Sequence, residues 1–257
     1  MFVYDNQQEK KIQRKKPTTP STYFQIKNVL QHLLLNISIY TEMQMTLRQW
    51  QKTYKDPKNF IVQASKKDGL DGWVTFPIGM GFNFAANYTQ KRAKKWQQGS
   101  HTNLVLCAIQ ATSDSRRRPT GVNRQMFIKN LEKANILNIK LPGSFYFAEL
   151  PCYKFIISPE GNGIDCHRHY EALMAGCIPI IEDNPLVRKK YIGCPILYTK
   201  DYSEINLSYL EQKYKEMIDE KYDFSKLFLS SYTLEDRDHI KDNGNYWVNK
   251  FCSKNWY

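Results

Sequence analysis

The chain has 257 residues, 42% hydrophobic and 24% charged, a composition that excludes wholesale disorder and allows one large domain or two small ones. Its net charge of +12 favours an anionic partner such as a nucleotide diphosphate, a nucleic acid or an acidic surface. The start has no signal-peptide pattern, and the most apolar segment, residues 29–40, is too short and too polar to span a bilayer. We therefore expect no membrane span and a cytoplasmic location.

The N-terminal third contains a basic tail and one long helical pattern. Basic residues cluster between positions 10 and 16, and we take residues 1–22 as a flexible tail. Apolar residues at helical spacing predict helix over residues 24–55. Residues 60–63 are expected to form a short strand, and residues 71–81, with one proline and three glycines, a loop or hinge.

From residue 103 onward the pattern alternates between strand and helix. Strands are expected at 104–109, 145–147, 155–158, 177–181 and 195–198, and helices from 121 or 123, at 165–175 and at about 204–222. This order predicts a doubly wound α/β fold with a mostly parallel sheet. We expect a reduced N-terminal unit at 23–95, a Rossmann-like domain at 96–235, and a helical segment at 236–257 that packs back.

Residues 154–181 carry the densest polar chemistry. A buried strand, a glycine-containing loop, a helix and a second buried strand can present backbone N–H groups to a phosphate. We expect Gly161 and Gly163 to allow positive φ and close backbone approach, Asp165 to cap the helix, and Gly176 to end it.

The helix in this segment also carries two residues suited to a nucleotide. Arg168 suits a diphosphate, and Glu171, three residues later, suits ribose hydroxyls. A capped surface helix with an Arg–Glu pair is the simpler reading, but it leaves Glu160, Asn162 and His167 unexplained. We therefore predict a site for a nucleotide-linked substrate.

Metal binding is not expected. Cys166, His167 and His169 are close in sequence, but neighbouring residues on a helix point in different directions, and no second ligand pair follows at finger spacing. The six cysteines form no C-x-x-C pair, and several lie in apolar settings typical of buried, reduced thiols.

The run Ser158-Pro159-Glu160-Gly161, then Arg168 and Glu171, then Gly176-Cys177-Ile178-Pro179, resembles the donor-binding half of exostosin-like glycosyltransferases of the family 47 type. The similarity is greatest to the short forms carried by large algal viruses. It covers about residues 145–185 closely and about 100–235 loosely. The resemblance implies a GT-B fold, a UDP-sugar donor, inversion without a metal, and a host-cytoplasmic location if the chain is viral. It also places Glu171 at the ribose and Arg168 by the phosphates.

Outside the closest similarity, the basic run Arg116-Arg117-Arg118 follows a predicted strand. An arginine there could neutralise a departing diphosphate, although a solvated basic loop explains any single one equally well. The expected donor-binding residues are Arg117, Arg118, Ser158, Glu160, Gly161, Asn162, Gly163, Asp165, His167, Arg168 and Glu171.

The N-terminal unit is shorter than a GT-B acceptor domain, so catalytic residues cannot be carried over from the family. Asp71, beside a glycine-rich segment, is our first candidate for the base, followed by Asp68 and His101; each is also an ordinary turn residue. The expected activity moves a sugar, with a marginal preference for xylose over galactose or glucuronate, to a glycan hydroxyl. The partners are then a UDP-sugar and a carbohydrate or glycoprotein-glycan acceptor.

Two other functions stay open. A nucleic-acid-binding protein could use the basic clusters and aromatic residues, although the acidic loop residues would repel phosphates. A GT-B domain could also bind a nucleotide or glycan without turnover.

Overall fold

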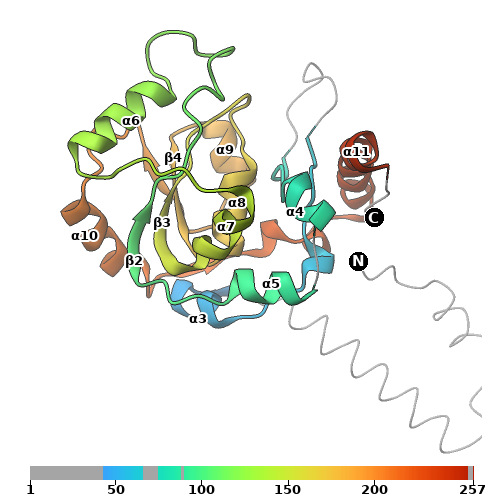
Figure 1. Cartoon of the computed structure of the whole chain (residues 1–257). Helices are drawn as coiled ribbons and strands as arrows, with labels where there is room; N and C mark the ends of the chain where they lie inside the picture. Colours follow the sequence, from blue (N-terminus) through green and yellow to red (C-terminus); the bar gives the residue numbers. More distant parts are fainter. Residues whose placement is uncertain (1–42, 66–74, 88–89, 254–256) are drawn as a thin grey trace, which may run out of the picture.

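The computed structural model describes residues 43–65, 75–87, 90–253 and 257. At its centre is a parallel sheet of four strands in the order β2-β3-β4-β5, flanked by helices (Figure 1). The strands are β2 (Asn103–Leu106), β3 (Tyr153–Ile157), β4 (Ile178–Glu182) and β5 (Leu197–Thr199). The chain therefore has a mixed α/β fold that is compatible with a Rossmann-like architecture.

The sheet is built from apolar runs because it is covered on both faces. All five residues of β4 are buried, as are the last three of β3. Phe155 pairs with Val105 on one side and with Ile178 on the other, and Ile180 pairs with Leu197. The four strands lie side by side in chain order, so this sheet has no reversal of strand order.

Five helices cover the sheet. They are α6 (Arg124–Lys133), α7 (Gly143–Glu149), α8 (His167–Met174), α9 (Pro185–Lys190) and α10 (Leu207–Met217). In Figure 1, α6 and α10 lie on one side of the sheet, and α7, α8 and α9 on the other. Helices α6, α9 and α10 each begin after an asparagine whose side chain accepts a hydrogen bond from a first-turn N–H; these residues are Asn123, Asn184 and Asn206.

The remaining elements come from the N-terminal part, from the segment directly before β3 and from the C-terminal part of the chain. Those from the N-terminal part are β1 (Gln44–Thr46), α3 (Leu47–Lys52), η1 (Pro57–Asn59), α4 (Phe82–Asn87) and α5 (Gln90–Gln97). The others are η2 (Leu150–Cys152), β6 (Lys221–Asp223), η3 (Ser225–Leu227), η4 (Leu229–Ser231) and α11 (Leu234–Cys252). Strand β1 pairs antiparallel with β6, and α11 packs against α4.

The buried face of α8 joins these parts into one hydrophobic core. Trp50 of α3 stacks on Phe224 with ring centres 4.0 Å apart, and its Nε1 donates to Leu173 O at 2.8 Å. The Tyr170 hydroxyl accepts from Ile61 N at 3.0 Å and donates to Leu227 O. Stacking of the Trp50 and Phe224 rings contributes about 0.5–1.5 kcal/mol beyond their buried area. Because Trp50 also donates to the backbone of α8, these contacts help to fix the position of that helix.

Several predicted elements are confirmed. The strands expected from residue 103 onward are present except 145–147, α6 begins after Asn123, and Gly176 follows α8 with φ +82°. Tyr170, Leu173 and Met174 are fully buried, as a core-facing side of that helix requires. The division into domains stays a prediction.

Other expectations were wrong. Residues 145–147 belong to α7, because alternation over three aromatic residues does not distinguish strand from helix. Within the expected helix 24–55, the described residues form β1 and the short α3. Residues 60–63 make only isolated bridges, and the pattern at 204–222 divides into α10 and β6.

The described cysteines, 107, 152, 166, 177 and 194, are all unpaired. Among the described residues, no helix combines the length and apolar character needed to cross a membrane.

Candidate functional site

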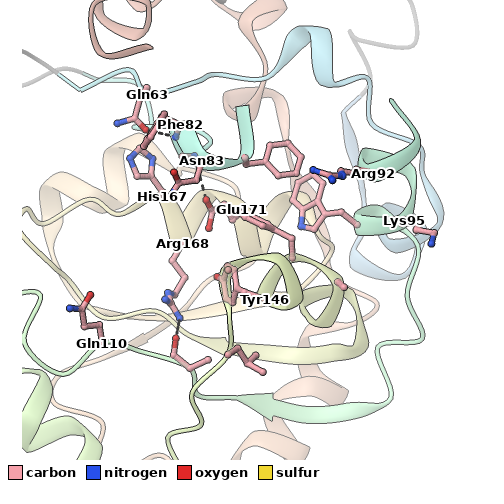
Figure 2. A pocket seen from close by; sticks show the side chains of 18 residues that line it. Gln63, Phe82, Asn83, Arg92, Lys95, Gln110, Tyr146, His167, Arg168 and Glu171 are labelled. Atoms are coloured by element: carbon pink, nitrogen blue, oxygen red, sulfur yellow. Dashed lines mark hydrogen bonds between the residues drawn. The ribbon is translucent and has the colours of Figure 1, made fainter. Parts of the chain in front are cut away.

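Helix α8 presents His167, Arg168 and Glu171 to a cavity of about 1070 Å³ (Figure 2). The cavity lies between α8 and α7 on one side and α4 and α5 on the other. Its other lining residues are Gln63, Gly81, Phe82, Asn83, Phe84, Arg92, Lys95, Trp96, Ala108, Gln110, Leu141, Gly143, Tyr146, Phe147 and Ala148.

The topology explains why these groups meet. Ala108 and Gln110 directly follow β2, and α8 follows the loop after β3. Since β2 and β3 are parallel neighbours, their carboxyl ends lie at the same edge of the sheet, where α/β proteins commonly bind ligands.

Glu171 is a desolvated acceptor at the cavity wall. Its side chain is buried, with 6% of the residue exposed, and burial raises the pKa of the carboxyl, an effect that the positive fields of His167 and Arg168 partly oppose. Gly81 N donates to its Oε1 at 3.3 Å, and the described residues offer it no ion pair within 4.0 Å. The carboxyl group can therefore accept hydrogen bonds from a ligand.

Arg168 is oriented by two contacts. Its Nη1 donates to Ala108 O, and the guanidinium carbon lies 4.9 Å from the centre of the Tyr146 ring. Figure 2 shows the side chain directed away from His167, toward Tyr146 and Gln110. A guanidinium has five donors, so the contact with Ala108 leaves capacity for an anionic ligand.

His167 is held in one tautomer by the neighbouring turn. Its Nδ1 lies 2.8 Å from Gly79 O, and because a carbonyl only accepts, Nδ1 must carry the proton. In the neutral ring, Nε2 is then an acceptor. Gly79 has φ +78°, and a Cβ there would lie 2.1 Å from Ile61 O, so no other residue fits this position without strain.

The turn after Gly79 packs closely on α8. Met80 N donates to Ile61 O at 2.7 Å, and Gln63 Oε1 accepts from Phe82 N at 2.8 Å. At Gly81, an added Cβ would lie 3.1 Å from Glu171 Oε1. Sequence reasoning identified this segment as a loop but missed that it forms a wall of the site.

The structure does not bring Arg117 and Arg118 to the cavity. Arg118 pairs with Asp114 and Glu182 at 3.0 Å each and with Glu160 at 3.6 Å. Arg117 pairs with Glu160. These partners are mostly buried, so the arginines neutralise buried carboxylates and connect Glu160, in the loop after β3, to Asp114 and Glu182.

Arg124, which sequence reasoning missed, joins this cluster. The residue is buried, and its guanidinium donates to the carbonyls of Gln110, Pro159 and Glu160 at 3.1, 2.9 and 2.7 Å. A Cβ at Gly161 would lie 3.2 Å from Nη2 of the same guanidinium. Arginine side chains therefore hold this loop in place, and none of its residues lines the cavity.

Most other predicted donor-binding residues also have structural partners. Ser158 is fully buried, with Oγ 2.7 Å from Nδ1 of His169, whose pKa burial lowers to about 4. Asp165 accepts from Ile78 N, Lys190 Nζ and Tyr191 Oη at 2.9, 2.9 and 2.8 Å.

Two local expectations about the loop were wrong. The residue that caps α8 is Cys166, not Asp165, because the Asp165 carboxylate is engaged with Lys190 and Tyr191 instead. Gly161 and Gly163 do not have positive φ. Gly163 and Asn162 are exposed.

Of the candidate bases, Asp71 and Asp68 lie outside the described residues. His101 is described but does not line the cavity: its Nε2 lies 2.9 Å from Ala175 O, and burial lowers its pKa. Within the described ranges, no cluster of His, Cys, Asp or Glu could hold a metal ion.

Two further lining residues carry unsatisfied polar atoms. Trp96 Nε1 and Tyr146 Oη are buried and have no hydrogen-bond partner among the described residues. Sequence reasoning missed both, although Trp96 follows the basic cluster of α5 at helical spacing from Arg92.

A scan against models of known protein families gave no match, and a search of curated proteins found no significant similarity.

Proposed function

We propose that the chain is an inverting glycosyltransferase that moves a sugar from a UDP-sugar to a glycan hydroxyl. One observation carries the proposal: His167, Arg168 and Glu171, which belong to the segment resembling the exostosin-like donor site, line one large cavity. Residues of α4 and α5 line that cavity on one side, and residues of α7 and α8 line it on the other. In this proposal the sheet is the donor half of a GT-B-like fold, and the N-terminal elements are its reduced acceptor side.

The cavity is large enough for two substrates. Its volume of about 1070 Å³ is slightly above the roughly 300–1,000 Å³ of ordinary ligand pockets. Arg168 binds the donor diphosphate, and Glu171 accepts hydrogen bonds from the ribose hydroxyls. Charge-assisted contacts of both kinds hold the nucleotide against α8.

His167 is the described side chain that best fits the base. As the oxygen of the acceptor hydroxyl attacks the anomeric carbon, the hydroxyl proton passes to Nε2 of His167. The Nδ1–H of His167 stays hydrogen-bonded to the Gly79 carbonyl. The bond from the anomeric carbon to the phosphate oxygen breaks, and its electron pair leaves with UDP. Arg168 stabilises the charge that develops on the departing diphosphate.

The test is release of UDP from UDP-xylose, UDP-galactose and UDP-glucuronate, with and without saccharide acceptors. His167→Gln should lower turnover by about 10²–10⁴-fold with UDP affinity nearly unchanged, because it removes the basic nitrogen and leaves Arg168 and Glu171 to hold the nucleotide. Asp71→Asn is the matched comparison. Loss of turnover in Asp71→Asn alone would make Asp71 the base, and UDP binding without release from any donor would indicate a binding domain instead.

A further inference from the structure

Four aromatic rings form a continuous row along the cavity, which we call the aromatic wall. Its members are Trp96, Phe84, Phe147 and Tyr146, and successive ring centres lie 5.1, 5.0 and 5.3 Å apart. The Arg168 guanidinium lies against the Tyr146 ring. The aromatic wall therefore runs from the proposed donor site on α8 to α5.

Both ends of the aromatic wall lack a hydrogen-bond partner. Trp96 is 2% exposed and Tyr146 is 9% exposed, yet Trp96 Nε1 and Tyr146 Oη are unpaired among the described residues. An unsatisfied buried polar group costs about 1–3 kcal/mol. The indole N–H can only donate, so only an acceptor atom, such as an oxygen of a ligand, can satisfy it.

The α5 end of the aromatic wall is also positively charged. Arg92, Lys95 and Trp96 lie three and four residues apart, on one face of α5, and all three line the cavity. Glu171 is the one acidic residue among the described lining residues, and it lies on α8. Figure 2 places Arg92 and Lys95 on the side of the cavity away from His167.

We propose that the α5 end of the aromatic wall is a subsite for an acceptor saccharide that carries an anionic group. Trp96 donates to an oxygen of this saccharide, the rings pack on its C–H face, and Arg92 and Lys95 attract its charge. The inference rests on the proposed function, because a nucleotide held by α8 leaves this end for the second substrate.

The test uses methyl β-D-glucuronide and methyl β-D-glucoside, which differ in one carboxylate, titrated into the full chain. UDP is titrated separately. The glucuronide should bind at least tenfold more tightly than the glucoside. Trp96→Phe should weaken glucuronide binding at least fivefold, and Lys95→Gln should reduce the preference for the charged sugar. Both variants should leave UDP affinity within twofold, and Lys213→Gln on α10 should change none of these values.

Several outcomes would overturn the subsite. Equal affinity for the two glycosides, or binding of UDP with none of the glucuronide, would contradict it and leave the proposed function standing. Inorganic phosphate that binds as tightly as the glucuronide would show an anion site without sugar recognition. A fall in UDP affinity in Trp96→Phe that matches the fall for the glucuronide would assign the charged end to the donor. Failure of UDP to bind the unaltered chain would instead contradict the proposed function.

Discussion

At the scale of single residues, the unsatisfied hydroxyl of Tyr146 separates a binding role from a packing role. A packed core tyrosine keeps a hydrogen-bond partner, as Tyr232 does by donating to Lys226 O at 2.7 Å. Tyr146 is buried to a similar extent, but its hydroxyl has no such partner among the described residues. Its hydroxyl is therefore better explained by a ligand than by the stability of the fold.

Replacing the two tyrosines tests this difference. Tyr146→Phe should leave the free energy of unfolding unchanged or raise it by up to about 1 kcal/mol, because it removes an unpaired polar atom. Tyr232→Phe should lower it by about 1 kcal/mol, because it breaks a made hydrogen bond and leaves a carbonyl unpaired. Urea denaturation of the unliganded variants measures both, and a clear loss of stability in Tyr146→Phe would contradict the ligand-facing interpretation.

Lys55 is a second buried residue with an unusual environment. It is 2% exposed, its Nζ lies 4.4 Å from the Trp50 ring centre with no hydrogen-bond partner in the described structure, and burial lowers its pKa to about 7. In the unfolded chain a lysine has a pKa near 10.4. Between these values the unfolded state binds more protons, so stability should rise with pH.

This pH dependence is measurable between pH 7 and 8.5, well below the pKa of a lysine in the unfolded chain. The Lys55 contribution should raise the free energy of unfolding by up to about 1.4 kcal/mol per pH unit. Lys55→Met should be more stable than the unaltered chain at pH 7 and should show a smaller rise. Guanidinium denaturation at several pH values measures the unfolding free energy of both proteins. An equal rise of this free energy with pH in the two proteins would show that Lys55 is not the group responsible.

At the scale of elements, the turn over residues 79–81 sets the position of two side chains of α8. Gly79→Ala should destabilise the fold by at least about 2 kcal/mol, because φ is positive and the Cβ would collide with Ile61 O. Gly81→Ala should fold but bind UDP more weakly, because its Cβ would press on Glu171. Gly163→Ala is the neutral control, because Gly163 is exposed, does not line the cavity, and an added Cβ would lie 3.8 Å from the nearest atom, Asp165 O. Thermal unfolding and UDP titration compare them, and unchanged UDP affinity in Gly81→Ala would contradict this role.

Arg117 and Arg118 connect Glu160, in the loop after β3, to the buried carboxylates of Asp114 and Glu182. Arg118→Leu leaves Asp114 and Glu182 buried with a lost partner and should reduce stability by about 3–5 kcal/mol. Arg48→Leu breaks an ion pair with Asp219 whose side chains are 55% and 66% exposed, and should change stability by less than about 1 kcal/mol. Denaturation measures both. A stable Arg118→Leu variant that no longer binds UDP would instead support the predicted role of Arg118 in phosphate binding.

For the whole molecule, sequence patterns predicted the parallel sheet because its buried strands are short apolar runs. They also predicted the start of α6, since an asparagine cap acts within its own turn. Contacts between distant segments were not predictable. Arg118 is part of a basic run and meets Glu160 and Glu182 only in the folded chain, so its charge suggested a ligand instead of a structural cluster.

The site was predictable in the same uneven way. His167, Arg168 and Glu171 could be grouped from the sequence because they lie on neighbouring turns of one helix, and they line one cavity. Trp96 and Tyr146 were not, because each looks like an ordinary core aromatic until the surrounding atoms show that its polar group is unpaired. Asp71, the first candidate for the base, stays a prediction.

The central claim is that α8 holds a uridine nucleotide through Glu171 and Arg168. Calorimetric titration of UDP into the unaltered chain and into Glu171→Gln tests it directly, with Glu132→Gln on the exposed part of α6 as the control. We expect the unaltered chain to bind UDP in preference to GDP and CMP, and Glu171→Gln to bind it at least about tenfold more weakly, since hydrogen bonds to a charged group are worth about 1.5–3 kcal/mol. Absence of UDP binding, or equal affinity in Glu171→Gln with the fold intact, would contradict the account.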